Sequence, residues 1–495
     1  MNRNDETLTT VQGNDTRSAV VVGGSIAGLL AARVLADHCD TVTLIDRDVF
    51  PVAPDHRKGV PQSHHAHALL STGYSIIEQL FPGILDALGA DGAATAANVI
   101  PVAIVSPHGP LRLPKQPEAF VSFSRVLLEW HVRERVARRP EVQIIANTEV
   151  TGLLTTPDRT RVTGVHLRTR GPEDRTTTLH ADLVVDASGR SSRTPRWLGE
   201  LGYGLPPVET INSNLRYVSR VYAKPAQFPA EWHHLIVNGR PPAAHAGFIL
   251  AIDQMRWHVT LGIMNGEPLP TDDAGFLHLA SRLPDPSIYE ALRVAQPLTP
   301  VREYRTPENH LRRFERMRRW PEGLIVTGDA VCAFNPTYGQ GMTVSALDAI
   351  TLARCLQEER RVTKAHFAQH FQQQLAATVT DAWLLATNQD LRWPGVRLTG
   401  VRPNPALPVL HRALDLVLYS AVVDPLIAQA YVAVVMLAKP PRALFAPALF
   451  ARVLAVAAVR TAKHLLGKAG DGGFALSPAA LAALRAMPEP GSGIA

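Results

Sequence analysis

A glycine-rich turn near the start of the chain has the residue types of a loop that binds a nucleotide. "GGSIAG" (23–28) places Gly23 and Gly28 at the outer positions of a G-x-G-x-x-G pattern, with Ser25 in the middle position. Such a loop needs a glycine for the tight turn, a small residue near the pyrophosphate, and a glycine where the helix meets the strand. Asp46 ends the next expected strand, where a carboxylate would hold ribose hydroxyls. The pattern predicts nucleotide binding.

A second polar, glycine-rich segment, "GDAVCAFNPTYGQGMTVSALDA" (328–349), lies about three hundred residues later. Asp329 ends a buried strand, where a carboxylate can accept hydrogen bonds from sugar hydroxyls. Pro336 and "YGQGM" form a loop that opens a helix. The free N–H groups of residues 341–343 would lie at the positive end of that helix. They would suit anionic oxygens or a ring that becomes negative on reduction.

A third segment, "DLVVDASGRSSR" (182–193), places Asp186 at a strand end before a turn of small residues. An aspartate there can simply form the turn. Because the first segment predicts a bound nucleotide, we favour a role for Asp186 near that nucleotide. The role would come from packing and backbone shape more than from catalysis.

The elements that must position these segments follow from apolar patterning. Strands at 18–24 and 41–48 flank a helix and form a βαβ unit. Short alternating segments over 142–185 predict a meander, and those over 214–264 predict a second, antiparallel sheet. A strand and a helix follow from residue 322.

Composition limits the classes of function. The chain has 495 residues, a net charge of +6 and three Cys without a CxxC pair, which favours a reducing, cytoplasmic location. No basic stripe interleaved with aromatics is visible, which disfavours nucleic-acid binding. No uninterrupted apolar run of about 20 residues predicts a membrane-spanning helix.

The C-terminal part has a different composition. Residues 425–470 hold six Lys or Arg and no Asp or Glu, among many Ala, Leu and Val. We expect an apolar helical appendage, with three interpretations left open: core packing, a lid over a greasy pocket, or a peripheral contact with anionic lipid.

Together the three segments resemble the group A FAD-dependent monooxygenases of the p-hydroxybenzoate hydroxylase fold, over residues 18–357. "RKGVPQSHHAHALL" resembles the stretch passing near the flavin in bacterial hydroxylases and epoxidases. "SRVLLEWHVRERV" looks like the helix whose leading Arg reaches the cofactor's phosphate or ribose side. "NPTYGQGMTVSAL" resembles squalene epoxidase and polyether-type polyene epoxidases.

The resemblance implies an α/β fold: a Rossmann-like FAD-binding domain (GR2-type), an antiparallel-sheet substrate domain and a C-terminal helical region. The expected boundaries are 18–205 and 301–390 for the FAD-binding domain, with a part near 98–123 joining the substrate sheet, 206–300 for the substrate domain, 391–495 for the helical region, and 1–17 for a flexible tail.

The resemblance also implies the cofactor and the residues that hold it. FAD is expected, with O2 and either NAD(P)H or a separate flavin reductase as electron donor. The expected cofactor-binding residues are Gly23, Gly24, Ser25, Ala27, Gly28, Asp46, Arg47, Arg57, Lys58, Arg125, Val150, Asp186, Gly189, Gly328, Asp329, Pro336, Gly339, Gly341 and Met342.

No protein acid–base pair stands out, so the flavin itself would be the reactive group. The candidates for the substrate pocket are His64, His67, Tyr217, Phe248 and Trp257; simple sheet packing is the competing interpretation for the three aromatic residues. The His64–His67 cluster lacks a carboxylate or Cys partner set, so no metal site is expected.

The expected function is insertion of one oxygen atom from O2, through a flavin hydroperoxide, into a hydrophobic alkene or aromatic small molecule of secondary metabolism. The alternatives are a geranylgeranyl-reductase-like reduction of prenyl double bonds, a flavin-dependent halogenase, and a non-enzymatic flavin-binding or sensor protein.

Overall fold

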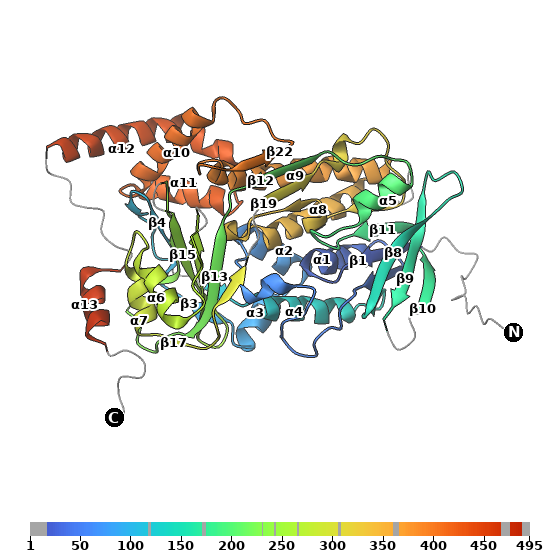
Figure 1. Ribbon diagram of the computed structural model, residues 1–495, viewed down its shortest axis with the longest axis horizontal. Coiled ribbons are helices and arrows are strands. Elements are labelled where there is room, and N and C mark those ends of the chain that lie inside the picture. Colours follow the sequence, from blue (N-terminus) through green and yellow to red (C-terminus); the bar gives the residue numbers. More distant parts are fainter. Residues whose placement is uncertain are drawn as a thin grey trace.

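The computed structural model describes residues 17–116, 120–170, 175–229, 231–241, 244–264, 267–304, 308–359, 366–466 and 476–487. Of the predicted flexible tail, residues 1–17, only Arg17 is among them. The chain has the predicted α/β fold, in which a parallel sheet with its helices and a larger mixed sheet with its own helices lie side by side (Figure 1).

Five parallel strands form the sheet that carries the first glycine-rich turn. Their spatial order is β20 (Leu324–Val326), β11 (Leu183–Asp186), β1 (Ser18–Val22), β2 (Thr41–Ile45) and β7 (Val142–Ile145). β11 and β20 are fully buried, as expected for strands covered on both faces. The last residues of three strands are aligned: Val22 pairs with Asp186, and Asp186 with Val326. The three polar segments therefore leave the sheet at the same edge.

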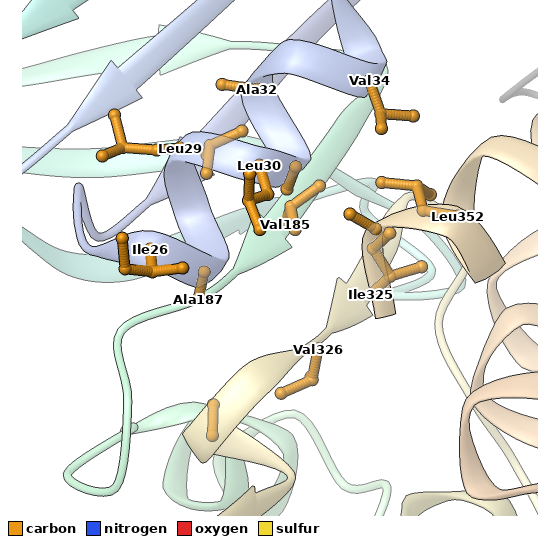
Figure 2. Close-up of a cluster of buried hydrophobic side chains, with 14 of the residues drawn as sticks. Ile26, Leu29, Leu30, Ala32, Val34, Val185, Ala187, Ile325, Val326 and Leu352 are labelled. Carbon is orange, nitrogen blue, oxygen red and sulfur yellow. The ribbon is translucent and has the colours of Figure 1, made fainter. Parts of the chain in front are cut away.

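Helices pack against this sheet. α1 (Ile26–Leu35) lies over it and against α8 (Gly341–Glu359), so that Leu30 meets Val185 of β11 and Leu352 lies near Ile325 of β20 (Figure 2). α8 in turn packs against α2 (Ser71–Leu80) and α9 (Phe367–Asp390), and α1 against α4 (Arg125–Ala137). These contacts fix the start of α8 relative to the first turn.

The second large sheet contains the predicted antiparallel strands. Its order is β17 (Gln296–Pro297), β13 (Arg216–Ala223), β16 (Arg256–Ile263), β15 (His245–Ile252), β14 (Trp232–Val237), β4 (Ile100–Ser106) and β5 (Gly109–Pro110), with β18 (Arg302–Tyr304) paired to β13. β4 runs parallel to β14, so a segment from the first part of the chain joins this sheet.

Both faces of this sheet are covered in part by helices, as the alternation of its residues requires. Leu235 and Val105 belong to a core with α6 (Asp273–Ser281), α7 (Ser287–Arg293) and α13 (Pro478–Ala486). Their neighbours Ile236 and Ile104 belong to a core with α10 (Leu407–Ala421), α11 (Pro425–Val435) and α12 (Pro447–Leu465). The C-terminal region is therefore helical, as predicted, and packs on one face of the sheet near β4 and β14 (Figure 1).

Smaller elements complete the fold. The predicted meander is formed by β8 (Thr148–Thr155), β9 (Val162–Thr169) and β10 (Arg175–His180). A further sheet has the order β21 (Cys332–Ala333), β19 (Glu308–Arg312), β12 (Val208–Asn212) and β22 (Arg397–Thr399); the remaining elements are β3 (Ala94–Ala96), β6 (Phe120–Ser122), α3 (Ile84–Ala90) and α5 (Thr194–Glu200). In the described part of the chain, no helix combines the length and apolar character needed to cross a bilayer.

Candidate functional site

A cavity of about 460 Å³ opens at the edge where β1, β11 and β20 end. Gly23 from the first segment, Gly189 from the second strand end and Gly341 from the start of α8 all line it. The three segments thus form one site, although about three hundred residues separate the first of them from the last.

Most of the predicted cofactor-binding residues line this cavity. They are Gly23, Ser25, Ala27, Asp46, Arg47, Arg57, Lys58, Arg125, Val150, Gly189, Asp329, Pro336, Gly339, Gly341 and Met342. Gly24, Gly28, Asp186 and Gly328 lie behind the wall, where they shape the backbone that the lining residues need.

Two glycines of the first turn have no room for a side chain. Gly23 has φ +103°, and a Cβ there would lie 2.6 Å from the carbonyl oxygen of Ala187. At Gly28 a Cβ would lie 1.7 Å from the carbonyl oxygen of Gly23. The turn therefore depends on glycine for its conformation at one end and for close packing at the other, as the sequence pattern predicts.

Asp46 ties the first turn to the end of β2. One carboxylate oxygen accepts the Gly24 N–H at 2.6 Å, and the other accepts the Asp48 N–H at 2.8 Å. Arg57 adds a longer contact at 3.3 Å. A carboxylate offers about four acceptor positions, so ribose hydroxyls can still be accepted beside these protein donors.

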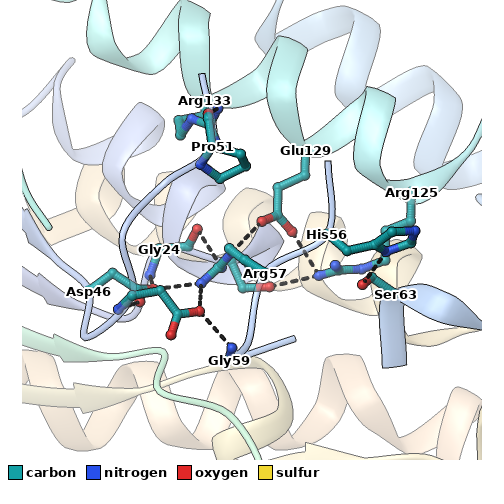
Figure 3. Close-up of polar contacts among 12 residues, drawn as sticks. Gly24, Asp46, Pro51, His56, Arg57, Gly59, Ser63, Arg125, Glu129 and Arg133 are labelled. Atoms are coloured by element: carbon teal, nitrogen blue, oxygen red, sulfur yellow. Dashed lines mark hydrogen bonds and ion pairs between the residues drawn. The ribbon is translucent and has the colours of Figure 1, made fainter. Parts of the chain in front are cut away.

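Arg57 lies at the centre of a buried ionic network (Figure 3). It pairs with Asp48 at 2.8 Å and with Glu129 at 2.8 Å. Arg125 pairs with the other oxygen of Glu129 at 2.9 Å and donates to the Ser25 hydroxyl at 2.8 Å. The network holds α4 against the first turn and orients the Arg125 guanidinium toward Ser25.

Basic side chains dominate the charge of the cavity wall. Beside the four predicted cations, Arg190 and Arg193 also line the cavity, and sequence reasoning did not name them. Arg190 donates to the backbone oxygens of Glu308 at 3.0 Å and Phe334 at 3.3 Å, which places its charge between the second and third segments. Its position directly after the "DASG" turn was the available signal.

Asp329 is the acidic group without a partner. It lines the cavity, and no described residue donates a hydrogen bond to it. Burial raises the pKa of its carboxyl, while the charges of Arg190 and Arg125 act in the opposite direction. A partly buried carboxylate that faces the cavity and has no described donor is free to accept hydroxyl groups of a ligand. The ribityl and ribose hydroxyls of FAD supply such donors, so the site fits this cofactor.

A buried carboxylate on α9, that of Asp390, fixes the loop before α8. Asp390, at the end of α9, is fully buried and accepts from the Tyr338 hydroxyl at 2.6 Å and from Asn309 Nδ2 at 2.6 Å. Asn309 in turn accepts the Asn335 N–H at 2.6 Å. Burial raises the pKa of Asp390 to about 6. These bonds fix residues 335–338, so that Pro336 and Gly339 line the cavity.

α8 begins at the cavity wall. Gly341 and Met342 line the cavity, and the first N–H groups of a helix have no acceptor within the helix. The side chain of Thr343 does not line the cavity, and its hydroxyl accepts the Leu70 N–H at 2.9 Å. The helix start therefore lies at the cavity, where its N–H groups would suit negative charge on a bound group.

The predicted residues behind the wall have structural partners. Asp186 accepts from the hydroxyls of Ser188 at 2.5 Å and Thr194 at 2.6 Å and is 1% exposed. Gly328 donates its N–H to Asp348 on α8 at 3.0 Å. Asp186 therefore fixes the turn after β11, and Gly328 fixes the turn after β20.

The histidines of residues 56–67 have separate roles. His67 lines the cavity, and its Nδ1 lies 2.9 Å from the His65 carbonyl oxygen. Burial lowers the pKa of His67 to about 3, so the ring is neutral and Nε2 is left as an acceptor. His64 lies outside the wall and stacks on His56 at 3.8 Å. In the part of the chain that is described, no three His, Cys, Asp or Glu side chains gather in a group that could hold a metal.

Tyr217 does not line the cavity but packs against Tyr304, which does. It is buried, and its ring is 5.2 Å from that of Tyr304, which lines the cavity. His65 meets both rings, at 5.1 and 4.9 Å, and its Nδ1 lies 2.9 Å from the Ser219 hydroxyl. Sequence reasoning missed Tyr304 because nothing in its local pattern separates it from an ordinary strand residue.

Phe248 and Trp257 lie on opposite faces of the eight-stranded sheet. Trp257 is packed edge-on against Phe228 at 4.7 Å, in the core shared with α6 and α7. Phe248 pairs in register with Ile236, whose side chain belongs to the core under the C-terminal helices. Neither residue lines the cavity.

Comparison with known proteins adds two kinds of similarity. Residues 16–366 match the model of a family described as "FAD binding domain". Protein Rv3254 of Mycobacterium tuberculosis is 35% identical over 393 residues, which cover 77% of this chain and 81% of that protein. Squalene epoxidase ERG1 of Candida albicans is 26% identical over 230 residues, covering 46% of this chain and 43% of that protein.

Solved structures share the fold at low identity. The flavin-dependent brominase Bmp2 superposes with a TM-score of 0.62 at 14% identity, covering 88% of this chain and 98% of that one. PqsL, a probable FAD-dependent monooxygenase from Pseudomonas aeruginosa, superposes with a TM-score of 0.56 at 18% identity, covering 76% and 97%.

Proposed function

The chain belongs to the FAD binding domain family of flavoprotein oxidoreductases, and from that premise we propose that it is a monooxygenase acting on a hydrophobic alkene or aromatic compound. The observation that carries the proposal is the single cavity in which the first turn, the "DASG" turn and the start of α8 meet around the unpartnered carboxylate of Asp329. One atom of O2 enters the substrate and the other leaves as water, with two electrons from NAD(P)H or a separate flavin reductase.

FAD would supply the redox chemistry and the activation of oxygen when bound. The chain's own residues would bind and orient it. Asp46 and Asp329 accept hydroxyls, Arg125 is held toward the first turn, and the α8 N-terminus faces developing negative charge.

The rest of the wall suits a hydrophobic substrate. Tyr304, Phe334 and Met342 contribute aromatic and apolar surface, and the neutral His67 leaves one acceptor nitrogen among them. The unpaired acceptors already described on the wall are His67 Nε2 and Asp329. Burial lowers the pKa of His67 to about 3, which makes it a weak base, and Asp329 is assigned to the cofactor hydroxyls. This favours alkene epoxidation, which needs no protein base, over hydroxylation of a phenol. The similarity to a squalene epoxidase supports the same choice.

Halogenation is the second candidate, because the fold is shared with a flavin-dependent brominase. The same cavity would then produce an oxidised halide in place of an oxygenated product. Reduction of prenyl double bonds is the third, since it would use the same cofactor site without oxygen.

One experiment separates these candidates. The FAD-loaded protein is reduced anaerobically with one equivalent of reductant and mixed with isotopically labelled O2 and candidate alkenes or phenols, with and without bromide. Label in the organic product supports oxygenation. A brominated product alone would support the halogenase. A saturated alkene formed before oxygen is admitted would support the reductase. Reoxidation without any organic product across the panel would overturn the proposal.

A further inference from the structure

Exposed apolar side chains gather on the C-terminal helices. Of the thirteen large hydrophobic side chains exposed in the described residues, seven lie within residues 409–466. Four of these belong to α12 and the residue that follows it: Leu454, Val459, Leu465 and Leu466, which are 50%, 57%, 84% and 69% exposed. Single exposed apolar residues are ordinary, whereas a cluster on one helix marks a contact surface.

The two sides of α12 divide cleanly. One side packs on the protein: Val453 and Ala457 are buried there, and the Arg460 guanidinium lies 4.1 Å from the Tyr419 ring. At about 100° per residue, the exposed apolar residues fall within an arc of roughly 140° on the opposite side. That outer face consists of Ala451, Leu454, Ala455, Ala458, Val459, Ala462, Leu465 and Leu466. A solvent-facing helix surface would ordinarily be polar, so this face is built to be covered.

The charge around the outer face indicates what covers it. Residues 425–466 hold five Lys or Arg and no Asp or Glu. Lys439, Arg442 and Lys463 are exposed, and none pairs with another described residue. Lys463 borders the apolar arc, at about 120° from Ala451. A second copy of this face would bring like charges together, whereas an anionic bilayer offers an apolar interior beneath negative headgroups.

We propose that α12 lies in the plane of an anionic membrane surface, with its outer face among the acyl chains. A helix of 19 residues is about 28 Å long, and it would lie along the interface without crossing it. α10, α11 and α12 pack on the face of the eight-stranded sheet near β4 and β14, so the membrane would hold the body of the protein through this layer (Figure 1). If the protein acts on hydrophobic substrates, as proposed above, it would then lie at the membrane into which such molecules partition.

The test is flotation of the FAD-loaded full chain with vesicles of phosphatidylcholine, with or without phosphatidylglycerol. We expect the chain to float with the anionic vesicles, at least ten-fold more than with neutral ones, and less as salt rises. The double variant Leu454→Glu/Leu465→Glu should lose at least ten-fold of this binding. Both positions are solvent-exposed, so the fold should tolerate them. Leu205→Glu, at a position 70% exposed and far along the chain from α12, is the matched control and should bind as the wild type does.

Lys463→Ala provides a second variant, which should weaken binding to anionic vesicles while leaving flavin content unchanged. Absence of flotation of the wild type with anionic vesicles would overturn the proposal. So would a wild type that light scattering shows to be a dimer and a glutamate variant that is a monomer, because a second copy would then cover the face. Vesicle binding requires no turnover, so these outcomes are independent of the proposed oxygenation.

Discussion

At the scale of single residues, this site rests on what a backbone or a carboxylate can tolerate. The glycines of the first turn are fixed by van der Waals distances, and the identity of Asp46 by the two N–H groups it accepts. Asp329 differs from them, because nothing described in the protein satisfies it. The structure of the turn therefore explains the glycines and Asp46, whereas Asp329 is explained by a bound ligand.

Gly28→Ala should break the first turn. The added Cβ would lie 1.7 Å from the Gly23 carbonyl oxygen, so the backbone must move, at a cost of roughly 1–3 kcal/mol or more. We expect a lower midpoint in urea and a reduced ratio of flavin to protein. Gly89→Ala on α3 is the control, because a Cβ there meets nothing within 4 Å. Equal behaviour of the two variants would contradict this account of the turn.

Asp329→Ala should weaken FAD binding without destabilising the apoprotein. A charge-assisted hydrogen bond contributes about 1.5–3 kcal/mol, so the Kd should rise roughly ten- to hundred-fold. The apoprotein should be as stable as the wild type or more stable, because the change breaks no described hydrogen bond and removes a partly desolvated carboxylate. Titration with FAD and thermal unfolding of the apoprotein measure the two effects. Full FAD affinity in the variant would show that Asp329 does not contact the cofactor.

At the scale of elements, α8 and α9 position the residues that line the cavity. α8 carries Asp348, which accepts the Gly328 N–H at 3.0 Å and the Thr327 hydroxyl at 3.2 Å. α9 carries Asp390, which holds the loop before α8 through Tyr338. Two helices outside the glycine segments thus determine where those segments lie, and each does so through a buried carboxylate.

Asp348 should make stability depend on pH. Desolvation raises its pKa to about 7, so the folded chain keeps the proton while the unfolded chain loses it. The contribution of Asp348 to the free energy of unfolding therefore falls as the pH rises from about 4 to about 7. Asn at position 348 cannot ionise. Relative to the wild type, the free energy of unfolding of Asp348→Asn should therefore rise over this pH range by about 1.4 kcal/mol per unit of pKa shift.

Urea unfolding at several pH values, with Asp381→Asn as the control, measures the difference between variant and wild type. The substitution also changes hydrogen bonds, but that adds the same free energy at every pH and does not alter how the difference varies with pH. Curves for Asp348→Asn and wild type that stay parallel across the range would rule out the buried titration.

At the scale of the whole molecule, the cavity joins parts of the chain that share no local sequence. β1 and β20 contribute their ends to the same edge although some three hundred residues separate them. The apolar face of α12 is the corresponding feature on the outside of the molecule, where a layer added after the nucleotide-binding segments presents a surface of its own.

FAD should therefore stabilise distant segments together. At a free concentration one hundred times its Kd, a ligand that binds only the folded state adds about 2.7 kcal/mol to the free energy of unfolding. Limited proteolysis should show protection of sites within residues 17–205 and 308–359 at the same FAD concentration. Protection of only one of these segments would contradict a shared cavity.

The sequence by itself determined the chemistry of the loops. Gly23, Gly28 and Asp46 could be assigned because each occupies a short pattern whose spacing is set by local backbone geometry. The α/β class followed from strand and helix periods in the same local way. Tyr304 and Asp390 could not be assigned, because each acts across a long separation in the chain: Tyr304 beside Tyr217, and Asp390 on Tyr338.

The tertiary structure alone decided which side of each element is used. Phe248 and Trp257 look alike in an alternating strand pattern, yet the sheet turns Trp257 toward α6 and α7 and Phe248 toward the opposite face, beside Ile236. α12 likewise has apolar residues on both its inner and outer sides, and only its packing through Val453 and Ala457 separates the buried face from the exposed one. Sequence periodicity fixes the spacing of faces along an element, whereas the partner packed against that element decides which face is buried.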